Sequence, residues 1–97
     1  MKSFVSYTIR DGIINTDILK QIYDELSNSG EVYIDLLHNN SNFPQLHVIK
    51  QLISSDYFIV IKTPKVTESP WCRFEMNLAK FMRIKKREVK LQDILQD

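Results

Sequence analysis

Glycine and cysteine are both scarce in this sequence, and their scarcity excludes several kinds of site. The only glycines are Gly12 and Gly30, so the sequence has neither a P-loop nor a dinucleotide-binding glycine fingerprint. It also has no Gly-x-Ser-x-Gly motif, which excludes a nucleophile elbow. The only cysteine, Cys72, can form no internal disulfide and is expected to be a small buried residue. A reducing, cytoplasmic compartment follows as an expectation.

Long apolar runs and clusters of metal ligands are missing as well. No apolar run approaches the roughly 20 residues of a membrane span, so no membrane contact of that kind is expected. Met1-Lys2-Ser3 leads straight into a strand-like stretch, so we expect no signal peptide. His38 and His47 have no cysteine or histidine partner at metal spacing, so we expect no metal site.

The charges nearly balance at a net +1, so the whole chain is not suited to binding nucleic acid. The exception is a basic segment near the C-terminus, in which Glu88 is the only acid and the cations are Lys80, Arg83, Lys85, Lys86, Arg87 and Lys90. Such a run is typical of the solvated face and frayed end of a helix. A contact with phosphate or a membrane surface is the alternative.

Three strand-like segments can be read from the sequence, at residues 4–7, 32–34 and 57–61. The third is continuously apolar, which is typical of a parallel strand buried on both faces. Residues 89–91 are interpreted as a brief fourth strand, with more helix as the alternative.

Helices are expected between these strands. The first begins at Asn15 or Thr16, the second at Pro44, and the third after Ser69, running to about Met82. The resulting alternation predicts one α/β domain over residues 1–97. Its fold would be an open parallel sheet of three to four strands with helices on both faces.

The third helix carries a carboxylate on its apolar face. Ser69 is a preferred N-cap and Pro70 fits the first helical position. Helical spacing places five residues on one face, which should point to the core: Trp71, Phe74, Glu75, Leu78 and Met82. No residue three or four positions from Glu75 is cationic, so an intrahelical ion pair does not explain it. A structural role, such as a hydrogen bond to Ser6 in the core, is the alternative to a functional one.

In an open parallel sheet, ligands bind beyond the carboxyl ends of the strands. Tyr7 and Arg10 follow the first strand, Asp35 follows the second, and Trp71 and Glu75 lie in the first turns of the third helix. Burial would raise the pKa of Glu75, which suits acid–base work. Its carboxylate would also suit stabilisation of an oxocarbenium-like charge on a sugar. Arg10 is suited to a phosphate group.

Four blocks carry a family resemblance, and they occur in the family's order and spacing. They are Phe4-Val5-Ser6-Tyr7 with Arg10-Asp11, Tyr33-Ile34-Asp35, Ser54 to Ile61, and Ser69-Pro70-Trp71-Cys72-Arg73-Phe74-Glu75. The last corresponds to a Ser-x-Trp-Cys-x-x-Glu motif and is the strongest. Together they resemble the Toll/interleukin receptor (TIR) domain family, especially its small bacterial members, over about residues 2 to 83.

The resemblance implies a flavodoxin-like sheet, here in a shortened form of the TIR fold. It implies an NAD+ nucleosidase that cleaves the nicotinamide–ribose bond, in some members with cyclisation of the product. Glu75 would be the catalytic residue, and Tyr7, Arg10, Asp35 and Trp71 would bind the dinucleotide. NAD would be the substrate, and no cofactor is implied.

The resemblance also implies an assembly. The loop from Asp35 to Pro44 corresponds to the family's loop for self-association, and a role in bacterial signalling or anti-phage defence would follow. Two other functions remain open, because a fold does not fix a function. One is a self-associating interaction module without chemistry, and the other is an enzyme that cleaves the glycosidic bond of nucleosides.

Overall fold

A computed structural model describes residues 1–35 and 44–90 of the chain. Four strands form one sheet: β1 (Lys2–Ser6), β2 (Glu31–Ile34), β3 (Tyr57–Lys62) and β4 (Lys85–Lys90). Their spatial order is β2-β1-β3-β4, and every pairing is parallel. The predicted α/β fold with an open parallel sheet is therefore confirmed.

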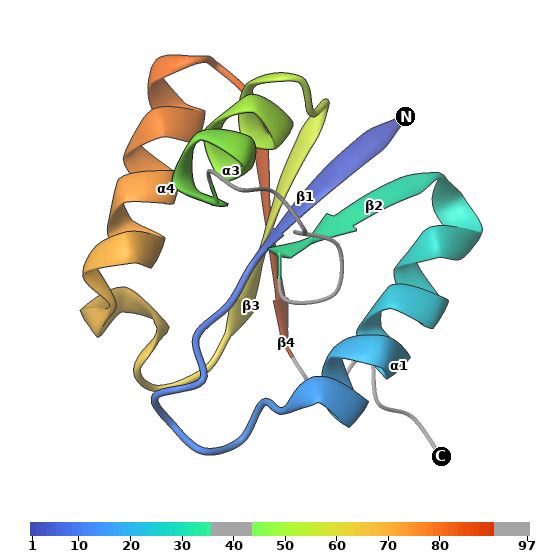
Figure 1. Ribbon diagram of the computed structural model, residues 1–97, viewed down its shortest axis with the longest axis vertical. Coiled ribbons are helices and arrows are strands. Elements are labelled where there is room, and N and C mark those ends of the chain that lie inside the picture. Colours follow the sequence, from blue (N-terminus) through green and yellow to red (C-terminus); the bar gives the residue numbers. More distant parts are fainter. Residues whose placement is uncertain (36–43, 91–97) are drawn as a thin grey trace.

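The helices cover both faces of this sheet. Helix α1 (Thr16–Leu26) lies on one face, and α3 (Pro44–Ile53) and α4 (Pro70–Phe81) lie together on the other (Figure 1). Two short 3-10 turns, η1 (Ser27–Ser29) and η2 (Val66–Glu68), precede β2 and α4. In the described residues, no helix has the length and apolar character needed to cross a membrane.

Side-chain caps fix where two of the helices begin. The Asn15 side chain accepts a hydrogen bond from the backbone N–H of Ile18 at 2.9 Å, and Ser69 accepts one from Cys72 at 3.3 Å. Both satisfy N–H groups that have no partner within the helix. The cap predicted at Ser69 is thus confirmed, and of the two residues expected to begin the first helix, Asn15 is the cap.

Gly30 connects η1 to β2 in a conformation that other residues rarely adopt, with φ of 148°. A Cβ atom at this position would lie 2.5 Å from the backbone oxygen of Met1. That same oxygen accepts a hydrogen bond from the N–H of Glu31 at 2.9 Å, which starts the pairing of β2 with β1. Glycine is therefore needed both for the backbone angle and for the close approach of the two strands.

Each face of the sheet has its own apolar core. The core beneath α1 contains Val5, Ile14, Leu19, Ile22, Val32, Ile34, Ile59 and Ile61. The core beneath α3 and α4 contains Phe4, Tyr33, Val48, Leu52, Phe58, Val60, Val66, Cys72 and Ala79. Alternate residues of the central strands thus point to opposite faces, so both faces of the sheet are buried from solvent there.

The basic segment near the C-terminus differs from the prediction. It is not the frayed end of a helix, because α4 ends at Phe81 and Lys85–Lys90 form strand β4. The fourth strand itself was expected, but only from Val89. Most of its side chains are exposed charges without an apolar alternation, and it is held by backbone pairing with β3. A strand at a sheet edge tolerates such a composition, and charged side chains there discourage further pairing.

The face that α4 turns toward the sheet also differs from the prediction. Its buried residues are Cys72, Glu75 and Ala79, whereas Trp71 and Phe74 are 37% and 41% exposed. Met82, just beyond the helix, is exposed as well. The small side chains of Cys72 and Ala79 allow the helix to approach the strands closely. Glu75 is buried as predicted, but the prediction that Trp71, Phe74 and Met82 share its buried face was wrong.

Candidate functional site

A cleft of about 290 Å³ lies where β1 and β2 end and α4 begins. Its lining consists of Val5, Tyr7, Thr8, Ile9, Arg10, Asp35, Ser69, Trp71 and Glu75. All five residues predicted as a site from the sequence are therefore neighbours in space. The reason is topological. Helix α1 follows β1 on one face of the sheet and α4 follows β3 on the other (Figure 1), and a parallel sheet forms its ligand crevice beyond the carboxyl ends of two such neighbouring strands.

Glu75 is the most enclosed acid of the cleft, with 4% of its surface exposed. It lies in the second turn of α4, and its Oε1 accepts a hydrogen bond from the hydroxyl of Ser6 at 2.9 Å. Ser6 is the last residue of β1 and is itself buried. The hydrogen bond to Ser6 expected for a structural role is therefore present, and the same carboxyl group also lines the cleft.

Burial raises the pKa of Glu75 from 4.5 to about 7, because the charged form loses its hydration. The negative charge of Asp35 acts in the same direction. Hydrogen bonds from Ser6 and Trp71 oppose these effects by stabilising the carboxylate. The group consequently exchanges a proton near neutral pH, where it can act as a carboxylate or as an acid.

Asp35 directly follows β2 and is held in place by a tyrosine of that strand. The hydroxyl of Tyr33 donates a hydrogen bond to Oδ1 of Asp35 at 2.9 Å. Burial, followed by this hydrogen bond, raises the pKa of Tyr33, so its hydroxyl keeps its proton and remains a donor. This positioning role of Tyr33 was not predicted from the sequence.

Trp71 forms an aromatic wall at the mouth of the cleft. Its ring stacks against that of Phe74, with centroids 5.1 Å apart and planes inclined by 25°. The exposed Trp71 lines the cleft, as the sequence-based prediction required, without being part of the apolar core. An indole in this position offers a flat surface to an aromatic or cationic ring.

Arg10 lies at the exposed rim, and a short turn supports its backbone. The N–H of Arg10 donates to the hydroxyl of Thr8 at 3.2 Å, and the N–H of Gly12 donates to the carbonyl of Ile9 at 3.1 Å. Asp11 connects this turn to the segment that follows β3, because its side chain accepts a hydrogen bond from the N–H of Lys65 at 3.1 Å. Arg10 is the one cation in the described lining, so an anionic group of a ligand would be oriented toward it.

Cys72 has a structural place beside the cleft. It is buried, as predicted, and its thiol donates to the carbonyl oxygen of Tyr7 at 3.0 Å. This contact ties the first turn of α4 to the end of β1. Thr8 and Ser69 also line the cleft, although neither was among the predicted site residues. Their hydroxyls support Arg10 and cap α4, respectively.

Two carboxylates, those of Asp35 and Glu75, are the potential metal ligands of the cleft. Within residues 1–35 and 44–90, no three histidine, cysteine or acidic side chains gather as a metal site would require. Most of the predicted self-association loop, residues 36–43, lies outside the described residues.

A scan of the sequence against protein-family models finds no match, and a search of curated proteins finds none.

Proposed function

We propose that this protein is a TIR-like NAD+ nucleosidase. The observation that carries the proposal is the buried Glu75 carboxyl, whose pKa is about 7, at the bottom of a cleft walled by Trp71. A carboxylate in such a place faces the developing positive charge of a sugar ring, which is the charge that cleavage of a glycosidic bond produces. A cytoplasmic setting and a role in bacterial signalling or defence belong to this proposal.

The reaction follows from the charges. The bond between ribose C1′ and the nicotinamide nitrogen breaks, and its electron pair neutralises the positively charged ring. The ribose is left with an oxocarbenium-like charge, which the carboxylate of Glu75 stabilises. Water then adds to C1′ and releases a proton, and the products are nicotinamide and ADP-ribose. Attack on C1′ by a ring nitrogen of the adenine in place of water would give the cyclised product.

The dimensions and charges of the cleft suit the nicotinamide end of the dinucleotide. About 290 Å³ lies at the lower limit of small-ligand pockets, so the cleft would hold the nicotinamide and its ribose. The cationic ring would stack on Trp71, and the phosphates would extend to Arg10 at the rim. Asp35, held by Tyr33, would accept a hydrogen bond from the sugar hydroxyls.

The test is release of nicotinamide from NAD by concentrated protein, followed by chromatography. Glu75→Gln is expected to reduce the rate at least about 100-fold, the scale found when one stabilising group is removed from an active site. The matched control is Glu25→Gln, the same chemical change on the exposed side of α1. The proposal would be refuted if concentrated, self-associated protein released no nicotinamide, or if Glu75→Gln released it as fast as the unmodified protein.

A non-catalytic interaction module is the second candidate, and the Ser6–Glu75 hydrogen bond favours it. A carboxyl group that is already bonded at 2.9 Å serves the packing of α4 on β1 without any substrate. This candidate predicts concentration-dependent association without NAD turnover. Release of a base from a deoxynucleoside, with NAD left intact, would instead point to the nucleoside glycosidic-bond enzyme.

A further inference from the structure

A second cavity, of about 450 Å³, lies near the C-terminal end of α4, where the chain turns into β4. It shares no lining residue with the Glu75 cleft. Its floor is apolar and belongs to the core beneath α3 and α4. Phe58 and Ala79 are buried in that floor, and Met76 and Ile84 are half-buried beside them. An apolar body placed here would therefore be removed from water.

The rim of this cavity is basic. Lys80, Arg83 and Lys86 all line it, and its described lining contains no carboxylate. Three cations around an apolar floor repel one another, and an anion would relieve that repulsion. The charge and the floor together favour a ligand with an anionic head and an apolar body.

Arg83 occupies a backbone position that usually belongs to glycine. Its φ is 58°, and it directly follows the C-cap of α4. Two hydrogen bonds close the helix around it, from Ile84 N–H to the Ala79 carbonyl at 2.9 Å and from Arg83 N–H to the Lys80 carbonyl at 3.1 Å. This is a Schellman ending, in which glycine avoids a steric cost. A strained arginine whose side chain lines a cavity indicates that the side chain has a use there.

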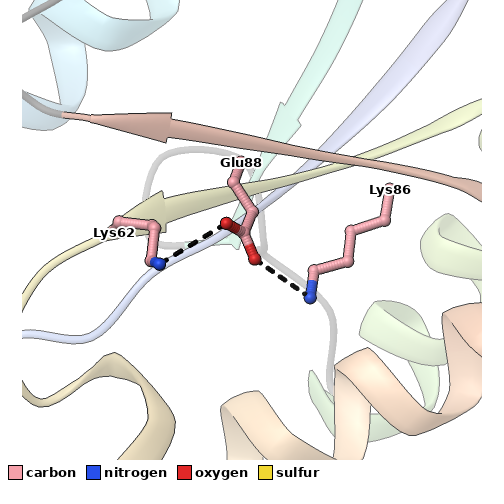
Figure 2. A network of polar contacts seen from close by, with 3 residues as sticks. All are labelled: Lys62, Lys86 and Glu88. Atoms are coloured by element: carbon pink, nitrogen blue, oxygen red, sulfur yellow. Dashed lines mark ion pairs between the residues drawn. The ribbon is translucent and has the colours of Figure 1, made fainter.

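Glu88 competes for one of the rim cations. It pairs with Lys86 at 3.3 Å and with Lys62 at 3.4 Å, as Figure 2 shows. These three side chains are about half exposed, so the ion pairs are weak and exchangeable. A stronger anion in the cavity would draw Lys86 away from Glu88.

We propose that this cavity binds a small amphipathic anion. The apolar body would cover Phe58, Met76 and Ile84, and a phosphate or carboxylate head would lie among Arg83, Lys80 and Lys86. The volume of about 450 Å³ is within the range of small-molecule pockets, so a whole small molecule fits.

Three probes separate the contributions of head and body: octyl phosphate below its micelle concentration, inorganic phosphate and 1-octanol. Titration calorimetry is expected to show octyl phosphate binding at least about tenfold more tightly than inorganic phosphate, since two buried methylene groups suffice for that factor. It should also bind more tightly than 1-octanol, because the rim cations attract only the charged head. Equal affinity for inorganic phosphate would show a merely cationic surface, and equal affinity for octanol a merely apolar one. Either result overturns the proposal.

Variants then locate the site. Arg83→Gly suits the backbone, so the fold is retained, yet octyl phosphate is expected to bind at least about threefold more weakly. Lys80→Gln should act in the same way. Arg73→Gln, an equal loss of charge at an exposed position of α4 that does not line the cavity, should have no effect. Glu88→Gln should tighten binding, because it releases Lys86. Unchanged binding in Arg83→Gly, or equal weakening in Arg73→Gln, refutes the assignment.

Discussion

Replacing Glu75 by glutamine should change how the stability of the protein depends on pH. The pKa of Glu75 is raised from 4.5 to about 7 in the folded protein, mainly because the group is buried. The folded state therefore holds a proton that the unfolded chain releases between about pH 4.5 and 7. A raised carboxyl pKa means that stability is full below this range and is lost as the pH rises through it.

The size of the effect follows from the two pKa values. The separation between 4.5 and about 7 corresponds to about 3 kcal/mol of unfolding free energy, most of which is lost between pH 5 and pH 8. Glutamine has nearly the same shape and can still accept the hydrogen bond from Ser6. Because it does not ionise, the Glu75→Gln variant should become more stable relative to the unmodified protein by that amount as the pH rises.

Urea unfolding followed by circular dichroism measures this difference directly. With a denaturant slope of about 1 kcal/mol per molar, the urea midpoint of the variant should rise by about 2 to 3 M relative to the unmodified protein between pH 5 and pH 8. All other titrating groups are common to both proteins and cancel in the comparison. Glu25→Gln is the surface control and should follow the unmodified protein. If the difference between Glu75→Gln and the unmodified protein stays constant within about 0.5 kcal/mol, burial does not control this carboxyl group.

Three further predictions test other parts of the structure. If the protein cleaves NAD, the rate of nicotinamide release should rise with pH and level off above about 7, as Glu75 ionises, and a flat profile from pH 5 to 8 would contradict this. Arg83→Gly should stabilise the fold by about 0.5 to 1 kcal/mol in urea unfolding, because it removes strain at φ of 58°, and a loss of stability would contradict the Schellman ending. Gly30→Ala should destabilise the protein by about 2 kcal/mol or more, since its Cβ would collide with the oxygen of Met1. Gly12→Ala, with φ of 72° and open space around it, should cost only about 1 kcal/mol, and equal losses would show that the collision is unimportant.

The sequence predicted much of the fold because its local signals agree with one another. Asn15 and Ser69 cap helices as their side chains require, and the continuous apolar run of β3 lies in the sheet interior. The edge strand β4 was harder to predict. A strand paired on one side, with solvated side chains, needs no apolar alternation, so Lys85–Lys90 had the composition of a helix end.

The candidate site was predictable in its members and less so in its geometry. Tyr7, Arg10, Asp35, Trp71 and Glu75 converge because parallel strands end at one edge of the sheet. Helical spacing alone could not decide which of two adjacent apolar stripes of α4 contacts the strands. Packing decided it, because a stripe with small side chains permits close contact, whereas a stripe with tryptophan and phenylalanine does not.

The position of β1 in the sheet affects how the chain can fold during its synthesis. It leaves the ribosome before the other three described strands, yet it lies between β2 and β3 and needs both neighbours. Phe4 pairs with Tyr33 on one side and with Phe58 on the other, so the second partner is translated long after the first. No two of the paired strands are joined by a hairpin, and closing such long loops slows folding. Until Tyr57–Lys62 has been synthesised, the nascent chain carries an open apolar strand that chaperones, or other copies of the chain, can bind.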